Sequence, residues 1–255
     1  MFIAINIGNT NTKIGLVKDQ EIFILQERTE TLKTAQDFER ALFALISQHE
    51  VESCKLDGSI LASVVPERTE PCINALTTFV GKKPIVIDKH IKTSVDFSNY
   101  GGLLGSDRIA VCVAAWNRCK APFVVIDMGT ATTFNVVNRN GVFLGGAILP
   151  GLQMCLESIN LKTAQIPKID FGKQTKVIGH NTEECVLSGA YYGTAAMLDG
   201  LVKDIEESIG ESVNAILTGG SADVVRPYIK TKVIYEPDLL MHGLADIYLA
   251  IRRDF

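Results

Sequence analysis

The sequence lacks any apolar run long enough to cross a membrane as a helix, which takes roughly 20 predominantly apolar residues. Its first residues, 1–5, carry no basic charge ahead of an apolar stretch, so we expect no signal peptide. Basic residues are not in excess either, and the formal net charge is -4. A nucleic-acid surface would need clustered Lys and Arg. We therefore expect a cytoplasmic protein that binds neither membranes nor nucleic acid.

Cysteine and histidine are few and scattered. The 6 cysteines form no C-x-x-C pair, and the 4 histidines do not cluster with them. Zinc sites and disulfide frameworks both depend on characteristic spacings of these residues. The pattern therefore favours reduced thiols in a protein core over disulfide bonds, and it predicts no metal centre built from His and Cys.

What the sequence does contain is an internal repeat. Residues 4–17 and residues 125–137 both have the pattern of an apolar strand, an Asx-x-Gly step, a turn of small hydroxyl residues and a second strand. The equivalent positions, Asn6 and Asp127, are separated by nearly half of the chain. A repeat at this spacing predicts a duplicated domain with one site-forming hairpin in each half.

Alternating strand and helix patterns follow each hairpin. The next expected strands are 59–65 and 84–88 in the first half and 214–218 and 232–235 in the second, with helical patterns at 34–49 and 181–209. Three antiparallel strands followed by β-α-β-α is the ribonuclease-H-like arrangement. We therefore predict an α/β protein of two such domains, as in actin-like ATPases, with a nucleotide cleft between them.

The boundary between these domains is expected where a helical pattern ends near residues 118–121. This gives an N-terminal domain of residues 1–119 and a C-terminal domain of residues 120–255. The last helical pattern, at about 240–253, is expected to cross back to the first domain.

The turn of the first hairpin has the sequence Gly8-Asn9-Thr10-Asn11-Thr12. A glycine in a tight turn lets the backbone approach a ligand closely, and successive backbone N–H groups can form a concavity that binds an anion. Hydroxyl and amide side chains add donors, and Lys13 adds a positive charge unless it faces solvent. The same residue types also form ordinary turns, but their recurrence in the second half favours a nucleotide site.

Asp127 ends the apolar strand at 123–126. A carboxylate in this position must be solvated, paired or bound to a cation, because burying it alone is too costly. Gly129 leaves space beside it. Two interpretations stay open on the residues alone: a cation site near phosphates, or a strand-end carboxylate that accepts hydrogen bonds from turn N–H groups.

A further candidate lies in the loop from Tyr100 to Arg108, which precedes an apolar helical pattern. Ser106 could cap that helix, and Asp107 would then simply complement the helix dipole. The small residues of the loop instead suit a surface shaped around a ligand. A carboxylate base beside an arginine fits phosphoryl transfer to an alcohol, in which Asp107 takes the hydroxyl proton and Arg108 steadies an anionic group.

Taken in order, these segments resemble the type III pantothenate kinase family along essentially the whole chain. The matching segments are 7–12, Tyr100 with 105–108, 127–133, 145–151 and 181–182. The resemblance implies ATP-dependent phosphorylation of pantothenate, the first committed step toward coenzyme A. It also implies a homodimer that uses Mg²⁺ and a monovalent cation, K⁺ or NH₄⁺.

The resemblance further implies a role for each candidate residue. Asp107 would be the general base, and Asp127 would hold the monovalent cation. The residues expected to bind ATP are Asn6, Ile7, Gly8, Asn9, Thr10, Asn11, Thr12, Lys13 and Thr130. Those expected to contact pantothenate are Tyr100, Gly105, Ser106, Asp107, Arg108 and Thr182.

The sequence departs from the family pattern at two places. Asn6 stands where the family usually has Asp, and Gly101-Gly102 stands where it tends to have Asn-Pro. A carboxylate at position 6 would help to hold Mg²⁺, whereas the amide keeps the shape and one acceptor oxygen but loses the charge. Two alternatives to an active pantothenate kinase therefore stay open: a catalytically weak or lapsed regulatory paralogue that binds nucleotide, or a kinase of the same fold that acts on another small alcohol.

Overall fold

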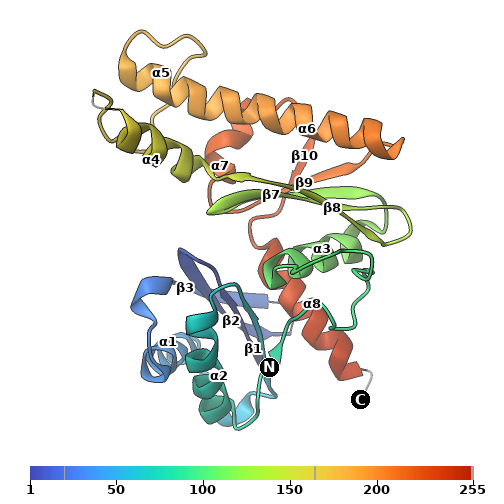
Figure 1. Ribbon diagram of the computed structural model, residues 1–255. Helices are drawn as coiled ribbons and strands as arrows, with labels where there is room; N and C mark the ends of the chain where they lie inside the picture. Colours follow the sequence, from blue (N-terminus) through green and yellow to red (C-terminus); the bar gives the residue numbers. More distant parts are fainter. Residues whose placement is uncertain (20, 164, 254–255) are drawn as a thin grey trace. The chain divides into compact units, whose positions relative to one another are not determined.

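The computed structural model describes residues 1–19, 21–163 and 165–253 of the chain (Figure 1). These residues form two compact units. The first comprises Met1–Arg118 together with the described residues from Asp238 onward, and the second comprises Cys119–Pro237. The C-terminal segment thus belongs to the same unit as the N-terminus. That residues 1–119 and 120–255 are separate domains stays a prediction.

The first unit is built on a five-stranded sheet with the order β3-β2-β1-β4-β5. Its strands are β1 (Phe2–Ile7), β2 (Asn11–Lys18), β3 (Glu21–Arg28), β4 (Ser59–Ser63) and β5 (Ile85–Val86). β1, β2 and β3 form an antiparallel meander, and β4 and β5 continue the sheet in parallel beyond β1. Every residue of β1 is buried, because this central strand is covered on both faces, which explains its nearly continuous apolar sequence.

Helices cover both faces of this sheet. They are α1 (Ala35–Gln48), α2 (Pro66–Val80), α3 (Ser106–Cys119) and α8 (Leu239–Arg253), with short 3-10 turns η1 (Thr29–Thr31) and η2 (Ser53–Lys55). Ile3, Ile5 and Ile7 point to one face and share a core with α1 and α2. Phe2 points to the other face, where its ring stacks on Tyr248 of α8 at 3.9 Å. The alternation of side chains along β1 therefore fixes which helix each face receives.

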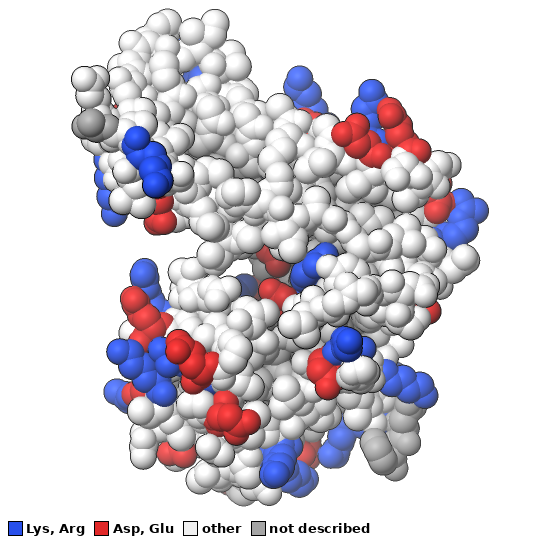
Figure 2. All heavy atoms as spheres, in the orientation of Figure 1, with Lys and Arg blue, Asp and Glu red and all other residues white. Residues whose placement is uncertain are grey.

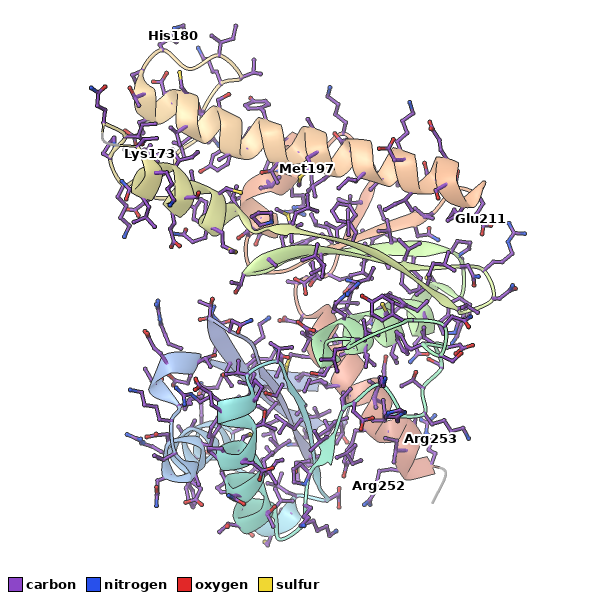
Figure 3. All side chains as sticks on the ribbon, viewed as in Figure 1. Lys173, His180, Met197, Glu211, Arg252 and Arg253 are labelled. Atoms are coloured by element: carbon purple, nitrogen blue, oxygen red, sulfur yellow. The ribbon has the colours of Figure 1, made fainter. Side chains whose placement is uncertain are left out.

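The helix ends follow from local sequence. α1 begins at a capping box, in which the Thr34 hydroxyl accepts the backbone N–H of Asp37 and the Asp37 carboxylate accepts the N–H of Thr34. At its C-terminal end α8 carries Arg252 and Arg253, which complement the negative end of the helix dipole (Figure 3). No helix among the described residues has the length and apolar character needed to cross a bilayer.

The second unit repeats the topology of the first, with the sheet order β10-β9-β6-β7-β8. Its strands are β6 (Phe123–Met128), β7 (Ala131–Val137), β8 (Phe143–Pro150), β9 (Asn214–Thr218) and β10 (Val233–Tyr235). Again three strands form an antiparallel meander, and two more join in parallel on the other side of the first strand. The expected α/β fold of two related halves is thereby confirmed.

The helices of the second unit are α4 (Leu152–Lys162), α5 (Thr182–Ser188), α6 (Thr194–Ile209) and α7 (Ala222–Val225), with the turns η3 (Gly189–Gly193) and η4 (Arg226–Tyr228). η3 is a π-helical turn that joins α5 to α6 in one long run of helix (Figure 1). Tyr191 of this turn is 1% exposed and packs into the core of the unit. The single helical pattern expected at 181–209 is thus one helix interrupted by a π-turn.

Acidic and basic side chains are interspersed on the face of the molecule shown in Figure 2. All 6 cysteines are free thiols, of which Cys72 and Cys112 are buried. Burial in apolar surroundings raises the pKa of both buried thiols, so they stay protonated at neutral pH. The expectation of reduced thiols in the core therefore fits Cys72 and Cys112, whereas Cys54 and Cys185 are exposed.

Two helical glycines give opposite predictions for substitution by alanine. Gly243 of α8 lies so close to α3 that a Cβ atom would overlap the carbonyl oxygen of Ala110, whereas Gly200 of α6 has open space at that position. We expect Gly243→Ala to destabilise the fold by roughly 1–3 kcal/mol through overpacking. Gly200→Ala should instead stabilise it by up to about 1 kcal/mol, because alanine is the better helix former. Urea unfolding of both variants would check this, and equal effects would contradict it.

Candidate functional site

The first candidate lies in the hairpin that joins β1 to β2. The turn is closed by a hydrogen bond from the N–H of Gly8 to the carbonyl oxygen of Asn11 at 3.1 Å. A Cβ atom on Gly8 would come within 2.9 Å of that same oxygen, so the close turn favours glycine. The exposed residues of the turn are Asn9, Thr10 and Asn11. Backbone and side-chain donors of this turn are therefore accessible to a ligand.

Two of the expected ATP-binding residues have side chains that face the protein interior. Ile7 and Thr12 are both 0% exposed. Ile7 packs in the core, and its carbonyl oxygen accepts the N–H of Val64 at 3.0 Å. These two residues could therefore contact a ligand only through their backbone atoms. Their side chains could affect binding indirectly, by fixing the conformation of the turn.

Asn6 and Lys13 are directly opposite each other across β1 and β2. Asn6 is 9% exposed, and its Oδ1 atom is buried without a hydrogen-bond partner among the described residues. Most buried polar atoms in proteins are hydrogen-bonded, so an orphaned acceptor calls for an explanation such as a ligand, water or ion. The Lys13 Nζ atom lies 3.2 Å from Oδ1 of Asp238, just before α8. The first hairpin thus carries the unpartnered Oδ1 of Asn6 beside the Lys13 ammonium, which is paired with Asp238.

The start of α3 is tied to the same edge of the sheet. The hydroxyl of Ser106 donates to the carbonyl oxygen of Ser63, the last residue of β4, at 3.1 Å. Ser63 pairs with Ile7, the last residue of β1. The hydroxyl of Ser106 is therefore used to anchor α3 to β4, while Gly105 accepts the first helical hydrogen bond, from Ile109. This anchor brings the segment 105–108 and the first hairpin to the carboxyl ends of two adjacent strands.

Asp107 follows this anchor directly. Its Oδ1 atom accepts the backbone N–H of Arg108 at 2.8 Å. Burial raises the pKa of the Asp107 carboxyl above its ordinary value of 3.8, although the Arg108 N–H, the Arg108 charge and the N–H of Asp107 itself oppose the shift. A carboxylate with a raised pKa is a stronger proton acceptor than an ordinary one, which suits a general base.

Arg108 and Tyr100 form a pair beside this carboxylate. Arg108 is 8% exposed. Its Cζ atom lies 5.7 Å from the centre of the Tyr100 ring, within the range of a cation–π contact. Its Nη1 atom also lies 3.5 Å from the Tyr100 hydroxyl, a long hydrogen bond. The structure therefore places Tyr100 next to the segment 105–108, and that these residues bind a ligand stays a prediction.

Asp127 and Thr130 belong to the second unit, at the hairpin that joins β6 to β7. Asp127 is partly buried, with Thr133 of β7 and Thr218 of β9 as its neighbours in the sheet. A Cβ atom on Gly219, which has a φ of +96°, would collide with the Asp127 side chain and the Met128 backbone. Only glycine at position 219 allows the chain after β9 to pack this closely against Asp127 and Met128. Thr130 is exposed in the turn.

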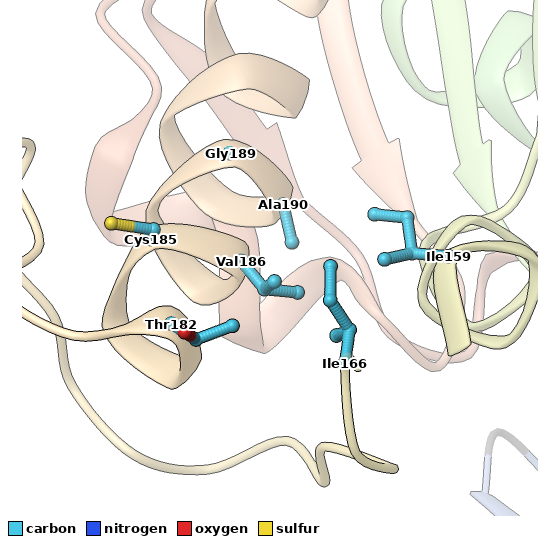
Figure 4. Close-up of a pocket in the computed structure, with 7 residues that line it drawn as sticks. All are labelled: Ile159, Ile166, Thr182, Cys185, Val186, Gly189 and Ala190. Atoms are coloured by element: carbon cyan, nitrogen blue, oxygen red, sulfur yellow. The ribbon is translucent and has the colours of Figure 1, made fainter. Parts of the chain in front are cut away.

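Thr182 lies elsewhere in the second unit, as the first residue of α5. The Asn181 side chain caps this helix by accepting the N–H of Glu184 at 2.9 Å. Thr182 lines a mainly apolar cavity of about 450 Å³ between α4 and α5 (Figure 4). The other lining residues are Ile159, Ile166, Cys185, Val186, Gly189 and Ala190. Thr182 is one of the few polar groups in this lining.

Two residues that the sequence did not single out contact the first hairpin. Asp238 pairs with Lys13, and Thr29 hydrogen-bonds to Gly8 and Thr12. Both residues lie outside the hairpin along the chain, so no local sequence motif predicts these contacts. Among the described residues, no group of three or more His, Cys, Asp or Glu side chains could hold a metal ion.

The chain is similar to known proteins in both sequence and fold. A family model described as type III pantothenate kinase matches residues 2–204. A curated protein of that name from Persephonella marina is 33% identical over 251 residues, which cover 97% of this chain and 98% of that protein. Among solved structures, a conserved Baf family protein from Campylobacter jejuni has a TM-score of 0.63 at 20% identity, with 99% and 100% of the two chains covered.

A second solved structure is a ROK family glucokinase from Streptomyces griseus in complex with glucose and AMPPNP. It has a TM-score of 0.58 at 13% identity, and 99% of each chain is covered. Identities this low show the fold alone. That fold is the actin-like kinase fold expected from the repeated hairpins.

The raised pKa of Asp107 predicts a stability effect of defined sign. A carboxyl whose pKa is higher in the folded state stabilises the fold only when protonated, and this contribution is lost as the pH rises above the ordinary value of 3.8. Asp107→Asn should therefore raise the Tm at pH 7, and the gain should shrink as the pH is lowered toward that value.

A matched control for this variant is Asp96→Asn. Hydrogen bonds from Ser98 lower the pKa of Asp96, so its ionised form is favoured in the folded state. Its replacement should leave the Tm at pH 7 unchanged or lower it. Thermal melts from pH 7 down to pH 4 would check both variants, and a lower Tm for Asp107→Asn at pH 7 would contradict the assigned burial cost.

Proposed function

Because this chain belongs to the type III pantothenate kinase family, we propose that it transfers the γ-phosphoryl group of ATP to the hydroxyl of pantothenate, the first step of coenzyme A biosynthesis. One geometric observation carries the proposal beyond the family relationship. The Ser106–Ser63 hydrogen bond holds Asp107 at the same sheet edge as the first hairpin. The proposed proton acceptor and the proposed phosphate-binding turn are thus supported by two paired strands of the same sheet.

Asp107 is the proposed general base. Its raised pKa supports this role, because a general base works best when its pKa lies nearer the working pH. In phosphoryl transfer a carboxylate takes the proton of the alcohol, while most of the rate enhancement comes from positioning the reactants and from electrostatic stabilisation of the transition state. The buried guanidinium of Arg108 would bind the negatively charged end of pantothenate, and the other proposed contacts are Tyr100, Gly105, Ser106 and Thr182.

The proposed ATP site consists of the segment from Asn6 to Lys13 together with Thr130. Accessible N–H groups and hydroxyls of the first turn would donate to phosphate oxygens. The Lys13 ammonium, which is paired with Asp238, would add a positive charge next to Asn6, its partner across β1 and β2. The glycine at position 8 supports this proposal, because it lets the backbone approach the phosphates closely.

Two cations belong to the proposal, and the residues present fit both. The orphaned Oδ1 of Asn6 offers an oxygen to Mg²⁺ or to one of its water ligands. Mg²⁺ bound to ATP would neutralise charge that develops on the phosphate oxygens. The Asp127 carboxylate, beside the hydroxyl residues Thr133 and Thr218, offers hard oxygen ligands to K⁺ or NH₄⁺.

We further propose that the protein is a cytoplasmic homodimer. Apolar side chains exposed on the second unit support self-association, because they include Leu144 and Ile148 on the edge strand β8 and Met154 and Leu161 on α4. Light scattering of the purified protein at micromolar concentration would decide this point, since a monomeric mass would rule the dimer out.

The reaction itself is tested by a coupled assay with ATP, Mg²⁺ and pantothenate, with and without K⁺. We expect product formation that K⁺ or NH₄⁺ increases. Asp107→Asn should lower kcat by about 10²-fold or more, because the hydroxyl loses its proton acceptor. A near-normal kcat in this variant would reject Asp107 as the base. ATP binding by calorimetry without product in the wild type would instead indicate a lapsed paralogue, and turnover of sugars alone would indicate another alcohol as substrate.

The metal proposal is tested by Asn6→Asp. A carboxylate at this position adds a charge beside the bound metal, so the Mg²⁺ concentration for half-maximal velocity should fall by roughly tenfold if the charge contributes about 1.4 kcal/mol. Binding of Mn²⁺ in the presence of a non-hydrolysable ATP analogue, followed by electron paramagnetic resonance, should tighten in parallel. Unchanged titrations in both measurements would place position 6 away from the metal.

A further inference from the structure

A pair of buried threonine hydroxyls lies behind the first hairpin. Thr12 is the second residue of β2, and Thr29 is the first residue of η1, directly after β3. They are 0% and 3% exposed, respectively. The β2–β3 ladder ends with the pair Asn11 and Arg28. Thr29, the next residue, therefore lies beside the turn that joins β1 to β2. Neither hydroxyl is accessible to a ligand, and both are used inside the protein.

Thr29 makes three hydrogen bonds to the hairpin. Its N–H donates to the carbonyl oxygen of Thr10 at 3.0 Å. Its hydroxyl donates to the carbonyl oxygen of Gly8 at 2.7 Å. Its Oγ1 atom lies 2.9 Å from Oγ1 of Thr12. A hydroxyl has only one hydrogen to donate, so Thr12 must be the donor in this last bond. The result is a directed chain from Thr12 through Thr29 to Gly8.

This chain determines which way a peptide group of the turn points. The peptide between Gly8 and Asn9 is planar and trans, so its carbonyl oxygen and its N–H point in opposite directions. The Gly8 carbonyl is held toward Thr29. The N–H of Asn9 must therefore point away from Thr29, in the exposed part of the turn. A backbone N–H held in this way is a preorganised donor for an anion.

Loss of the Thr29 hydroxyl would leave two groups without this partner: the partly buried Gly8 carbonyl and the buried Thr12 hydroxyl. A polar group that loses its partner away from water is costly. We therefore expect the peptide between Gly8 and Asn9 to rotate so that the Gly8 carbonyl oxygen contacts water. That rotation would turn the Asn9 N–H away from its position. The side chain that prevents it comes from η1, outside the first hairpin itself.

We propose that Thr29 is a positioning residue for the triphosphate, because its hydroxyl fixes the peptide that presents the Asn9 N–H to a phosphate. This rests on the proposed function, since it assumes that the first hairpin binds ATP. Thr29 acts through the hairpin and does not touch the nucleotide. Its loss should therefore weaken ATP binding and leave pantothenate binding almost unchanged.

The test compares three variants of the full-length protein. Thr29→Val removes the hydroxyl at nearly constant shape, and Thr29→Ser keeps the hydroxyl. Thr31→Val is the matched control, because the Thr31 hydroxyl in the same η1 turn donates to the exposed carbonyl of Arg28 and, among the described residues, makes no hydrogen bond to the hairpin. For Thr29→Val we expect a rise of about tenfold in KM for ATP, and an equal rise in the Kd of a non-hydrolysable analogue measured by calorimetry. KM for pantothenate should change less than about twofold.

The two other variants separate positioning from packing. Thr29→Ser should restore KM for ATP to within about threefold of the wild type, and Thr31→Val should match the wild type. A normal KM for ATP in folded Thr29→Val, or equal defects in the Val and Ser variants, would overturn the proposal. If Thr29→Val does not fold, Thr12→Val removes one link of the chain and should raise KM for ATP by a smaller factor. A wild type that binds no ATP would instead overturn the proposed function.

Discussion

The hydrogen bond between Ser106 and the carbonyl oxygen of Ser63 is the contact on which the site of the first unit depends. It fixes the first residue of α3 to the end of β4, and β4 in turn pairs with β1. The carboxyl ends of neighbouring parallel strands meet at one sheet edge, which is where α/β proteins place their ligands. An acid on a helix and a turn on a hairpin thereby share one support, although nearly a hundred residues separate them along the chain.

Buried polar atoms at this edge divide into satisfied and unsatisfied ones. Thr12 donates to Thr29, which donates to the Gly8 carbonyl, so this chain of hydrogen bonds holds the turn from inside. Asn6 is buried with an oxygen that has no partner among the described residues. A fold tolerates such a cost where a ligand later supplies the missing contact. The difference between these groups separates residues that shape the site from those that would meet its ligand.

The sequence predicted the fold because its signals are local and periodic. The apolar strands, the Asx-x-Gly steps and the half-chain spacing of the repeat were sufficient to place the two meanders and their hairpins. The contacts of Asp238 with Lys13 and of Thr29 with Gly8 were not predictable in this way, because register and helix packing bring these residues together. The same holds for Ser106, which the sequence suggested as a helix cap but which donates to Ser63 instead.

The stacking of Phe2 on Tyr248 also links the order of synthesis to the order of folding. β1 is synthesised well before α8, which covers one of its faces. The first unit therefore cannot complete its core before α8 has been synthesised, whereas the segments of the second unit are contiguous and can fold earlier. Until α8 has been synthesised, the nascent chain leaves the face of β1 that α8 later covers exposed to solvent.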